Sequence, residues 1–345
     1  MTVLTTVYNR AAYLGATIES VLGQSFADLE LLVVDDGSSD ASVEVAQSFR
    51  DPRVRVLRNP TNLGIPRTRN RGLAEARGEY LAILDSDDVA RPDRLRRQVD
   101  FLDAHPDVAV VGSFCAWIDG RGRRLRRVKR RPVHPDDVRA ALLFRCPLQN
   151  SAAMGRTAVL RRFGYRSEFE VGEDYDLWTR LSAEHRLANL PLVLVDYRVH
   201  GERTPRRAMQ RLRGAIVRDQ LRALGLEPSA EDLARHLRAI RCLKRTGESD
   251  QALLEWASEW LGRLRRANER TARYPEPAFS RALGRFWRGL WWRYRGPGRW
   301  ALLSHPRGRR LAGAGLWSRK PARAGERAQA RRGPARGSTA SDASR

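Results

Sequence analysis

The sequence predicts an α/β fold: a Rossmann-like, mainly parallel sheet flanked by helices, followed by a helical C-terminal extension. In the first 115 residues, short apolar runs alternate with segments that place apolar side chains at helical spacing. Two of these runs end in acidic clusters, as expected for strands whose carboxyl ends border a ligand crevice. Repeated βα units of this kind imply parallel strands with helices on both faces of the sheet.

The individual elements follow from the apolar runs in chain order. Strands are expected at 3–7, 31–34, 54–57, 80–84 and 108–111. Helices are expected at 11–23, 43–49, 67–76 and 92–105, because apolar residues recur there at intervals of three and four. We expect a basic loop at 119–135, a helix at 136–145, and a second part of the same domain at 150–200.

The C-terminal part of the chain has helical signals at 206–224, 230–245 and 251–270. Ser229 and Asp232 have the spacing of a helix-capping pair. From residue 318 onward almost nothing is apolar, which predicts disorder. The expected organisation is an α/β domain, a helical extension, a basic aromatic segment and a disordered basic tail, at 1–205, 206–278, 279–317 and 318–345.

The charge of the chain is large and unevenly distributed. The 345 residues carry a formal net charge of +24, and residues 281–345 hold 17 Arg or Lys and two acidic residues, a net charge of +15. This asymmetry indicates an anionic partner, either a membrane surface or a nucleic acid. No apolar stretch approaches the roughly 18 residues of a membrane span. The N-terminus lacks the pattern of a signal peptide, and the three distant cysteines favour a reducing cytosol over a disulfide framework.

Residues 281–295 form an amphipathic helical pattern with one aromatic and one cationic face. The apolar face consists of Leu283, Phe286, Trp287, Leu290, Trp291 and Tyr294. Helices of this type bind in the plane of an anionic membrane surface. The alternatives are that this face packs on the α/β domain, or that the segment binds nucleic acid.

A cluster of three carboxylates follows the apolar run 81–84: Asp85, Asp87 and Asp88. Acidic side chains are almost never buried unpaired, and like charges at one strand end are unfavourable unless a cation offsets them. Mg²⁺ and Mn²⁺ accept carboxylate oxygens and keep positions open for phosphates. The Asp-x-Asp pattern therefore indicates a metal–diphosphate site, and the alternative is a solvated acidic turn.

A second acidic cluster, Asp35 and Asp36, follows the apolar run 31–34. The Gly and Ser residues after it mark a turn before a helix. In a parallel sheet, both clusters lie at the same edge and face one crevice. The alternative is that Asp35 and Asp36 only shape the turn.

Several motifs occur in a fixed order around these clusters. They are Thr-x-Tyr-Asn at 6–9, Asp-Asp-Gly-Ser at 35–38, Leu-Asp-x-Asp-Asp at 84–88, Glu-Asp-x-x-Leu-Trp at 173–178, and Tyr-Arg-Val-His at 197–200. In this order they resemble the family 2 glycosyltransferases over roughly residues 1–203. The resemblance implies the GT-A fold, a nucleotide-sugar donor, Mg²⁺ or Mn²⁺ as cofactor, and transfer with inversion at the anomeric carbon.

The same resemblance implies roles for individual residues. Thr6 and Tyr8 would flank the base and ribose of the donor, and Asp36 would accept a hydrogen bond from the base. Asp85 would contact the ribose or metal-bound water, and Asp87 would bind the metal that bridges the two phosphates.

Three further residues complete the implied site. Asp174 would be the catalytic general base, His200 would approach the metal or diphosphate, and Arg69 would lie near the phosphates. Structural alternatives remain for Tyr8, packing on the sheet edge, and for His200, a hydrogen-bonded structural histidine. Asp88 and Asp176 are interpreted as capping or solvated residues. Cys146 and Trp178 are interpreted as packing residues, and the alternative for Cys146 is that it lines the acceptor side.

The implied function is sugar transfer to a hydroxyl of a glycan or lipid-linked acceptor, in the synthesis of a bacterial cell-surface polysaccharide or glycolipid. We expect a cytoplasmic enzyme, peripheral on the inner face of the cytoplasmic membrane through residues 281–295. The alternatives are a nucleotide-sugar-binding protein without catalysis and a basic nucleic-acid-binding protein. Nucleic-acid binding leaves the acidic motifs unexplained, so we expect no nucleic-acid partner.

Overall fold

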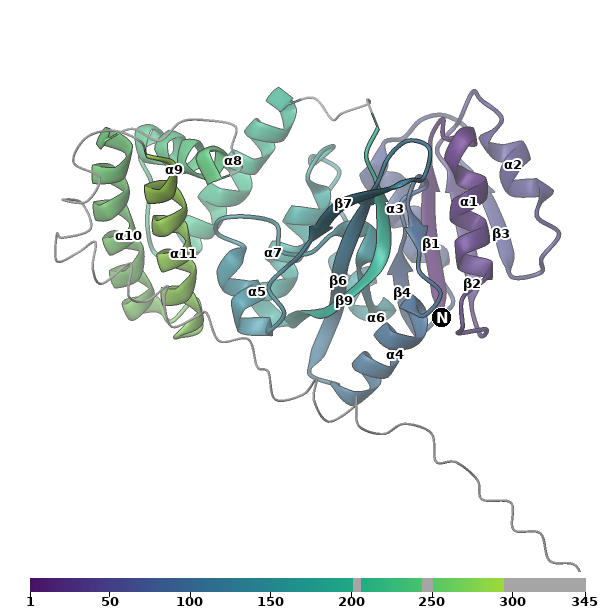
Figure 1. Ribbon diagram of the computed structural model, residues 1–345, viewed down its shortest axis with the longest axis horizontal. Helices are drawn as coiled ribbons and strands as arrows, with labels where there is room; N and C mark the ends of the chain where they lie inside the picture. The colour runs from purple at the N-terminus through teal and green to yellow at the C-terminus, as the bar shows by residue number, and fades with distance from the viewer. Residues whose placement is uncertain (201–205, 244–250, 295–345) are drawn as a thin grey trace, which may run out of the picture.

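The computed structural model describes residues 1–200, 206–243 and 251–294 (Figure 1). The α/β domain occupies one end of the molecule, and the helices that follow it in the chain gather at the other end (Figure 1). The tail expected to be disordered, 318–345, and residues 295–317 of the basic segment lie outside the described residues.

Within the described residues, the strands form one nine-stranded sheet in the order β3-β2-β1-β4-β8-β6-β9-β5, with β7 paired to β6. The bounds are Thr2–Val7 (β1), Glu30–Asp35 (β2), Val54–Arg58 (β3), Tyr80–Ile83 (β4), Val89–Ala90 (β5), Val108–Ile118 (β6), Arg124–Lys129 (β7), Met154–Arg156 (β8) and Arg186–Arg198 (β9). The α/β class predicted from the sequence is confirmed.

The sheet is parallel in its first half and mixed in its second. β1 pairs in parallel with both β2 and β4, and β2 pairs in parallel with β3. The short strand β8 runs antiparallel to both of its neighbours, β4 and β6. β6 and β9 are parallel to each other, while β5 and β7 are antiparallel to their partners. The predicted parallel sheet is therefore interrupted where β8 inserts between β4 and β6.

Strand β7 corrects the expectation of a loop over 119–135. Its side chains are exposed, apart from the partly buried Lys129, so no alternation of apolar and polar residues marks it as a strand. β7 pairs only with β6 and lies at an edge. Basic side chains are common on such edges because they discourage pairing with another chain.

Helices cover both faces of the sheet. Their bounds are Ala11–Leu22 (α1), Ser42–Ser48 (α2), Ile65–Glu75 (α3), Arg94–Ala104 (α4), Pro135–Ala141 (α5), Thr157–Phe163 (α6) and Glu173–Glu184 (α7). The apolar residues of α1 and α4 join one core cluster with the sheet, and those of α3, α6 and α7 join another. Trp178 of α7 is fully buried in the second cluster, which confirms its interpretation as a packing residue.

The C-terminal helices share a core of their own. They are Arg206–Ala223 (α8), Ala230–Leu243 (α9), Gln251–Thr271 (α10) and Ala278–Arg293 (α11). The Ser229 hydroxyl accepts a hydrogen bond from the Asp232 amide at 3.0 Å, as the capping pair predicts. Phe144, which follows α5, packs against Phe286 of α11 with ring centroids 4.7 Å apart. This contact joins the helical core to the α/β domain.

The aromatic face of α11 corrects the expectation of a membrane contact through 281–295. All six apolar side chains of that face are at most 6% exposed, because they pack against α9, α10 and α5. Arg281 also binds Asp137 of α5 at 3.0 Å. Burying one large apolar side chain stabilises a fold by about 1.5–3 kcal/mol. The apolar face is therefore part of the protein core and is not available to a lipid surface.

Candidate active site

The candidate site lies at the carboxyl ends of β1, β2 and β4. In the parallel register, Val7 of β1 lies opposite Asp35 of β2, and Leu4 lies opposite Ile83 of β4. Asp36 and Asp85 follow the ends of β2 and β4, so the fold brings both acidic clusters to one edge of the sheet. This arrangement confirms the expectation drawn from the parallel topology.

Asp35 shapes the turn after β2. One of its carboxylate oxygens accepts hydrogen bonds from the amides of Gly37 and Ser38, both at 3.1 Å, and the side chain is fully buried. Gly37 has a φ of +72°, and a Cβ there would lie 2.7 Å from the carbonyl carbon of Thr61. The Asp-Asp-Gly-Ser sequence is thus required locally by this turn.

Asp36 holds the loop that leads into α3. Its carboxylate accepts from Asn59 Nδ2 and the Leu63 amide, both at 2.8 Å, and from the Gly64 amide at 3.0 Å. A carboxylate has about four acceptor positions. Asp36 therefore shapes the loop, as the structural alternative holds, and retains capacity for about one further donor.

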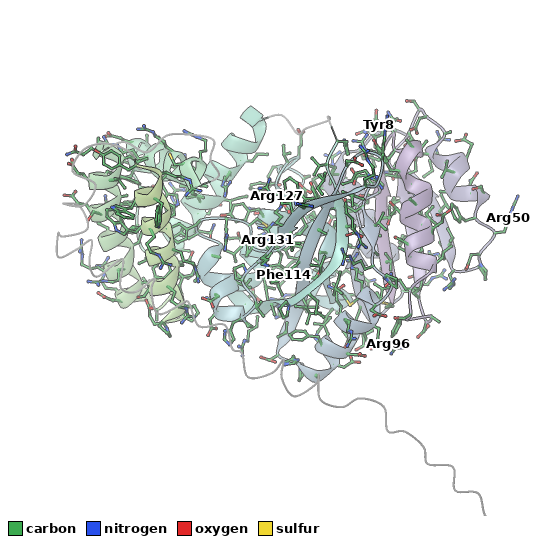
Figure 2. All side chains as sticks on the ribbon, viewed as in Figure 1. Tyr8, Arg50, Arg96, Phe114, Arg127 and Arg131 are labelled. Carbon is green, nitrogen blue, oxygen red and sulfur yellow. The ribbon has the colours of Figure 1, made fainter. Side chains whose placement is uncertain are left out.

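Thr6 and Tyr8 lie at the end of β1 and just beyond it. Thr6 is partly buried, and Tyr8 is 46% exposed at the rim of the molecule (Figure 2). Asn9, with a φ of +52°, turns the chain there, and its side-chain oxygen accepts from the Ser39 amide at 2.9 Å.

Arg69 links the end of β4 to the start of α7. Its guanidinium donates to Asp85 Oδ1 at 2.9 Å and to Glu173 Oε1, and only 6% of the residue is exposed. Burial opposes the charge on Arg69, but the two carboxylates outweigh it and hold its pKa above the ordinary value. Burial raises the pKa of Glu173 to about 7 despite the lowering effect of Arg69.

Asp85 is held by residues that sequence reasoning missed. The Asp85 amide donates to Ser151 Oγ at 3.1 Å, and the Asn150 amide group lies 3.5 Å from Asp85 Oδ1. Burial raises the pKa of the Asp85 carboxyl, and Arg69 counteracts this effect. Asn150, Ser151 and Glu173 belong to this constellation, and only Glu173 carried a signal, as the neighbour of Asp174 in a motif.

Asp87 and His200 form a pair that suits a divalent cation. Asp87 Oδ2 lies 2.7 Å from His200 Nε2, and the His200 ring stacks on Tyr13 with centroids 5.6 Å apart. Among the described residues, no group of three or more His, Cys, Asp or Glu side chains is placed to hold a metal. Mg²⁺ is commonly bound through only one or two carboxylates and completes its shell with phosphates and water. Asp87 fits that mode of binding, with His200 beside it.

The surroundings of Asp88 and Asp176 correct the interpretation of both as capping or solvated residues. Asp88 is fully buried and accepts from the Arg198 amide at 2.8 Å, so it is not solvated. Burial raises the pKa of Asp88 well above the ordinary value, and Asp85 and Asp87 add to the effect. Asp176 is 2% exposed and forms ion pairs with Arg166 and Arg180, so it is structural as well.

Asp174 faces a cavity of about 1190 Å³ between the α/β domain and the C-terminal helices. It lies in the first turn of α7, where the helix dipole favours a carboxylate. Its Oδ1 accepts from the Tyr175 amide at 2.7 Å, and its Oδ2 lies 3.9 Å from Cys146 Sγ. Cys146 lines the same cavity, and burial raises the pKa of its thiol to about 12, so it stays protonated.

Lys129 also lines this cavity and gives a pH-dependent prediction. Burial, together with the charge of Arg131, lowers the pKa of Lys129 to about 8 from an ordinary value of 10.5. Between these pH values the unfolded chain holds a proton that the folded chain lacks, so rising pH favours folding. We expect the free energy of unfolding of the wild type, relative to Lys129→Met, to increase from pH 7.5 to 10.

Urea denaturation at several pH values measures this difference. Arg130→Met is the matched control, because its guanidinium does not titrate in this range and its curve should run parallel to the wild type. A constant difference between wild type and Lys129→Met would contradict the lowered pKa.

Comparisons with known proteins agree with this geometry. The model of the family described as "Glycosyl transferase family 2" matches residues 2–167. The putative glycosyltransferase EpsE of Bacillus subtilis is 33% identical over 190 residues, covering 53% of this chain and 67% of that protein. The succinoglycan biosynthesis protein ExoO of Rhizobium meliloti is 34% identical over 189 residues, covering 51% of this chain and 54% of that protein.

Similarity to solved structures extends over most of the chain. The crystal structure of S. aureus TarS 1–349 in complex with UDP matches with a TM-score of 0.54 and 18% identity, covering 91% of this chain and 90% of that chain. At this identity the match establishes the fold alone. That fold is the GT-A arrangement followed by C-terminal helices.

The fold and the family model together identify the class of protein as a glycosyltransferase with the GT-A arrangement. The chain belongs to glycosyltransferase family 2, which confirms the resemblance found in its motifs. Within the described ranges, each helix is too short or too polar to cross a bilayer.

Proposed function

We propose that this chain is an inverting, metal-dependent glycosyltransferase that moves a sugar from a nucleoside-diphosphate donor to a hydroxyl of a glycan or lipid-linked acceptor. The observation that carries the proposal is the Arg69 bridge between Asp85 and Glu173. It fixes the strand end that leads to Asp87 against the helix start that bears Asp174. In this proposal Asp87 would be the metal ligand and Asp174 the base, on the two elements that Arg69 links.

The donor would bind across the ends of β1 and β2. Thr6 and the exposed ring of Tyr8 would flank the base and ribose, and Asp36 retains an acceptor position for an N–H of the base. Asp85, held by Arg69, would contact the ribose or metal-bound water. The TarS structure of similar fold was solved with UDP, which supports a nucleoside diphosphate as the ligand of this edge.

Asp87 and His200 would hold the cation. A bound Mg²⁺ or Mn²⁺ would offset the negative charge that develops on the leaving diphosphate. The carboxylate and the imidazole lie close together and are only 21% and 15% exposed, so a cation there would have restricted access to solvent.

Asp174 would remove the proton from the acceptor hydroxyl. The acceptor oxygen forms a bond to C1 of the sugar while the bond between C1 and the diphosphate oxygen breaks. The proton passes to Asp174, and the bonding electron pair leaves with the nucleoside diphosphate. Because one displacement occurs at C1, its configuration inverts. A hydroxyl needs such a base because its pKa lies far above neutrality.

The product would belong to a bacterial cell-surface polysaccharide or glycolipid, made on the cytoplasmic side of the membrane. The relative ExoO is named as a succinoglycan biosynthesis protein, which supports this class of pathway. The proposal does not include membrane attachment through 281–295, because the apolar face of that segment is buried.

Replacing Asp87 with alanine tests the donor site. Purified protein is incubated with Mn²⁺ or Mg²⁺ and a panel of UDP-, GDP- and dTDP-sugars, with and without polysaccharide acceptors, and nucleoside diphosphate release is followed. We expect metal-dependent release from one donor, and a decrease of at least about 100-fold in Asp87→Ala, because the leaving charge loses its cation.

Asp100→Ala is the matched control, because it removes a carboxylate of α4 whose side chain is 57% exposed. It should leave the release rate unchanged. Nucleotide binding without release from any donor, in the presence of acceptors, would favour the non-catalytic binding protein. Metal-independent release at the wild-type rate in Asp87→Ala would contradict the assigned metal site.

A further inference from the structure

The cavity that contains Asp174 is strongly cationic. Eight arginine or lysine side chains line it, six of them outside α11: Arg127, Lys129, Arg130, Arg131, Arg145 and Arg213. Among the described residues that line it, Asp174 is the only acid. Figure 2 shows Arg127, which belongs to β7, and Arg131 in the middle of the molecule, on the side of the sheet nearer the C-terminal helices.

The positive charge in this cavity is only partly compensated. Lys129 and Arg131 both donate to the same neutral acceptor, Gln149 Oε1, at 2.8 and 3.3 Å. Arg285 of α11 binds Asp137 at 3.3 Å, an acid that does not itself line the cavity. Burial and the neighbouring Arg131 and Arg285 lower the pKa of Arg145 to about 10. Crowding like charges in this way is unfavourable unless an anion binds among them.

The cavity is distinct from the donor site. None of the residues assigned to the donor or the metal lines it, and Asp174 is the one assigned site residue among those that do. The apolar side chains of Phe144, Ile216 and Phe286 form part of the wall. Apolar walls exclude water and strengthen charge interactions inside a cavity. A general excess of surface arginine does not produce this combination of concavity, apolar wall and convergent cations.

We propose that the acceptor of this enzyme carries a phosphate group near the hydroxyl that receives the sugar, and that this cavity binds the phosphate. The inference rests on the proposed function, because it takes Asp174 as the base. A phosphate or phosphodiester offers several acceptor oxygens to arginine and lysine side chains. Bound among them, it places the adjacent hydroxyl beside Asp174. A neutral glycan supplies no further counter-charge to the cations that line the cavity.

Calorimetric binding to the full-length protein, saturated with UDP and Mn²⁺, tests this assignment. The probes are a glycerol-phosphate oligomer, farnesyl diphosphate and the neutral sugar maltotriose. The test variant is Arg130→Gln/Arg145→Gln, which removes two charges that line the cavity. The control is Arg124→Gln/Arg126→Gln, which removes two exposed charges of β7 that do not line it.

We expect at least one phosphate probe to bind more tightly than maltotriose. The test variant should raise its Kd by at least about tenfold, because two charge-assisted contacts are lost, while the control stays within about twofold. Preference for the oligomer identifies a polymeric phosphodiester, and preference for farnesyl diphosphate identifies a lipid-linked acceptor.

Equal binding of the phosphate probes and maltotriose, with UDP bound normally, would overturn this inference and leave the proposed function standing. The same holds if both double variants bind the phosphate probe like the wild type. Failure of the wild type to bind any nucleoside diphosphate would instead overturn the proposed function and the acceptor role together.

Discussion

Replacing Asp174 with asparagine is expected to abolish sugar transfer while leaving donor binding unchanged. Asparagine keeps the size and shape of aspartate but does not take up a proton from the acceptor hydroxyl at neutral pH. A positioned general base contributes about 10²–10⁴-fold to a rate. We therefore expect kcat to fall by about 1,000-fold, with the Kd for UDP within about twofold of wild type, since Asp174 lies on the cavity side of the site.

The geometry at α7 makes this substitution mild for the fold. The Oδ1 atom of Asp174 accepts from the Tyr175 amide at 2.7 Å, and an asparagine oxygen accepts the same hydrogen bond. Asp176→Asn is the matched control on the same helix. It removes a buried charge that binds Arg166 and Arg180, so it should lower stability and not act on the proton transfer step.

Steady-state transfer assays with donor and acceptor, together with calorimetric UDP binding, measure both effects. Full activity in Asp174→Asn would rule out its role as the base. Equal losses of kcat and of UDP affinity would indicate that Asp174 supports the structure of the donor site instead.

Local signals explain why most of the α/β domain was predictable. Leu14, Ile18 and Val21 recur at helical spacing on α1, and all three are fully buried. The turn after β2 is set by Asp35 and Gly37, two residues of a four-residue motif. Once the strands were placed in parallel, the meeting of the acidic clusters at one edge followed from topology.

The partners of individual charged groups could not be predicted in the same way. Arg69 and Glu173 are 104 residues apart in the chain, and no local sequence pattern predicts their contact. Asp87 and Asp88 are adjacent and identical, yet Asp87 contacts His200 while Asp88 is fully buried. The strand that follows them, β5, has two residues, which is too short for its alternation to reveal which carboxylate points inward.

Helix α11 shows what the periodicity of apolar residues cannot predict, namely the partner of the apolar face. The pattern over 281–295 identified the apolar face correctly, but an amphipathic pattern states only that one face avoids water. Lipid and protein interiors satisfy that condition equally well. The deciding contacts come from α5, α9 and α10, and α5 precedes α11 by more than 100 residues.

Replacing Arg69 with methionine is expected to destabilise the fold severely. Methionine occupies a similar volume, but it leaves the carboxylates of Asp85 and Glu173 near each other without the cation that now lies between them. Removing one partner of a buried ion pair costs about 3–5 kcal/mol, because an uncompensated charge remains. The Arg69→Met/Glu173→Gln variant removes one of the two carboxylates and should recover part of that loss in urea denaturation.

The pH dependence of this loss separates charge from packing. In Arg69→Met we expect the pKa of Glu173 to be higher in the folded chain than in the unfolded chain. The folded chain then binds a proton at Glu173 more readily than the unfolded chain does. Stability should therefore recover as pH falls from 8 to 5, whereas a packing defect would persist.

Arg55→Met is the matched control, since Arg55 also joins two carboxylates, those of Glu30 and Glu75, but is 23% exposed. We expect it to cost about 1 kcal/mol or less. If both variants lose a similar free energy of unfolding, independent of pH, the large effect of Arg69→Met does not arise from burial of its charged groups.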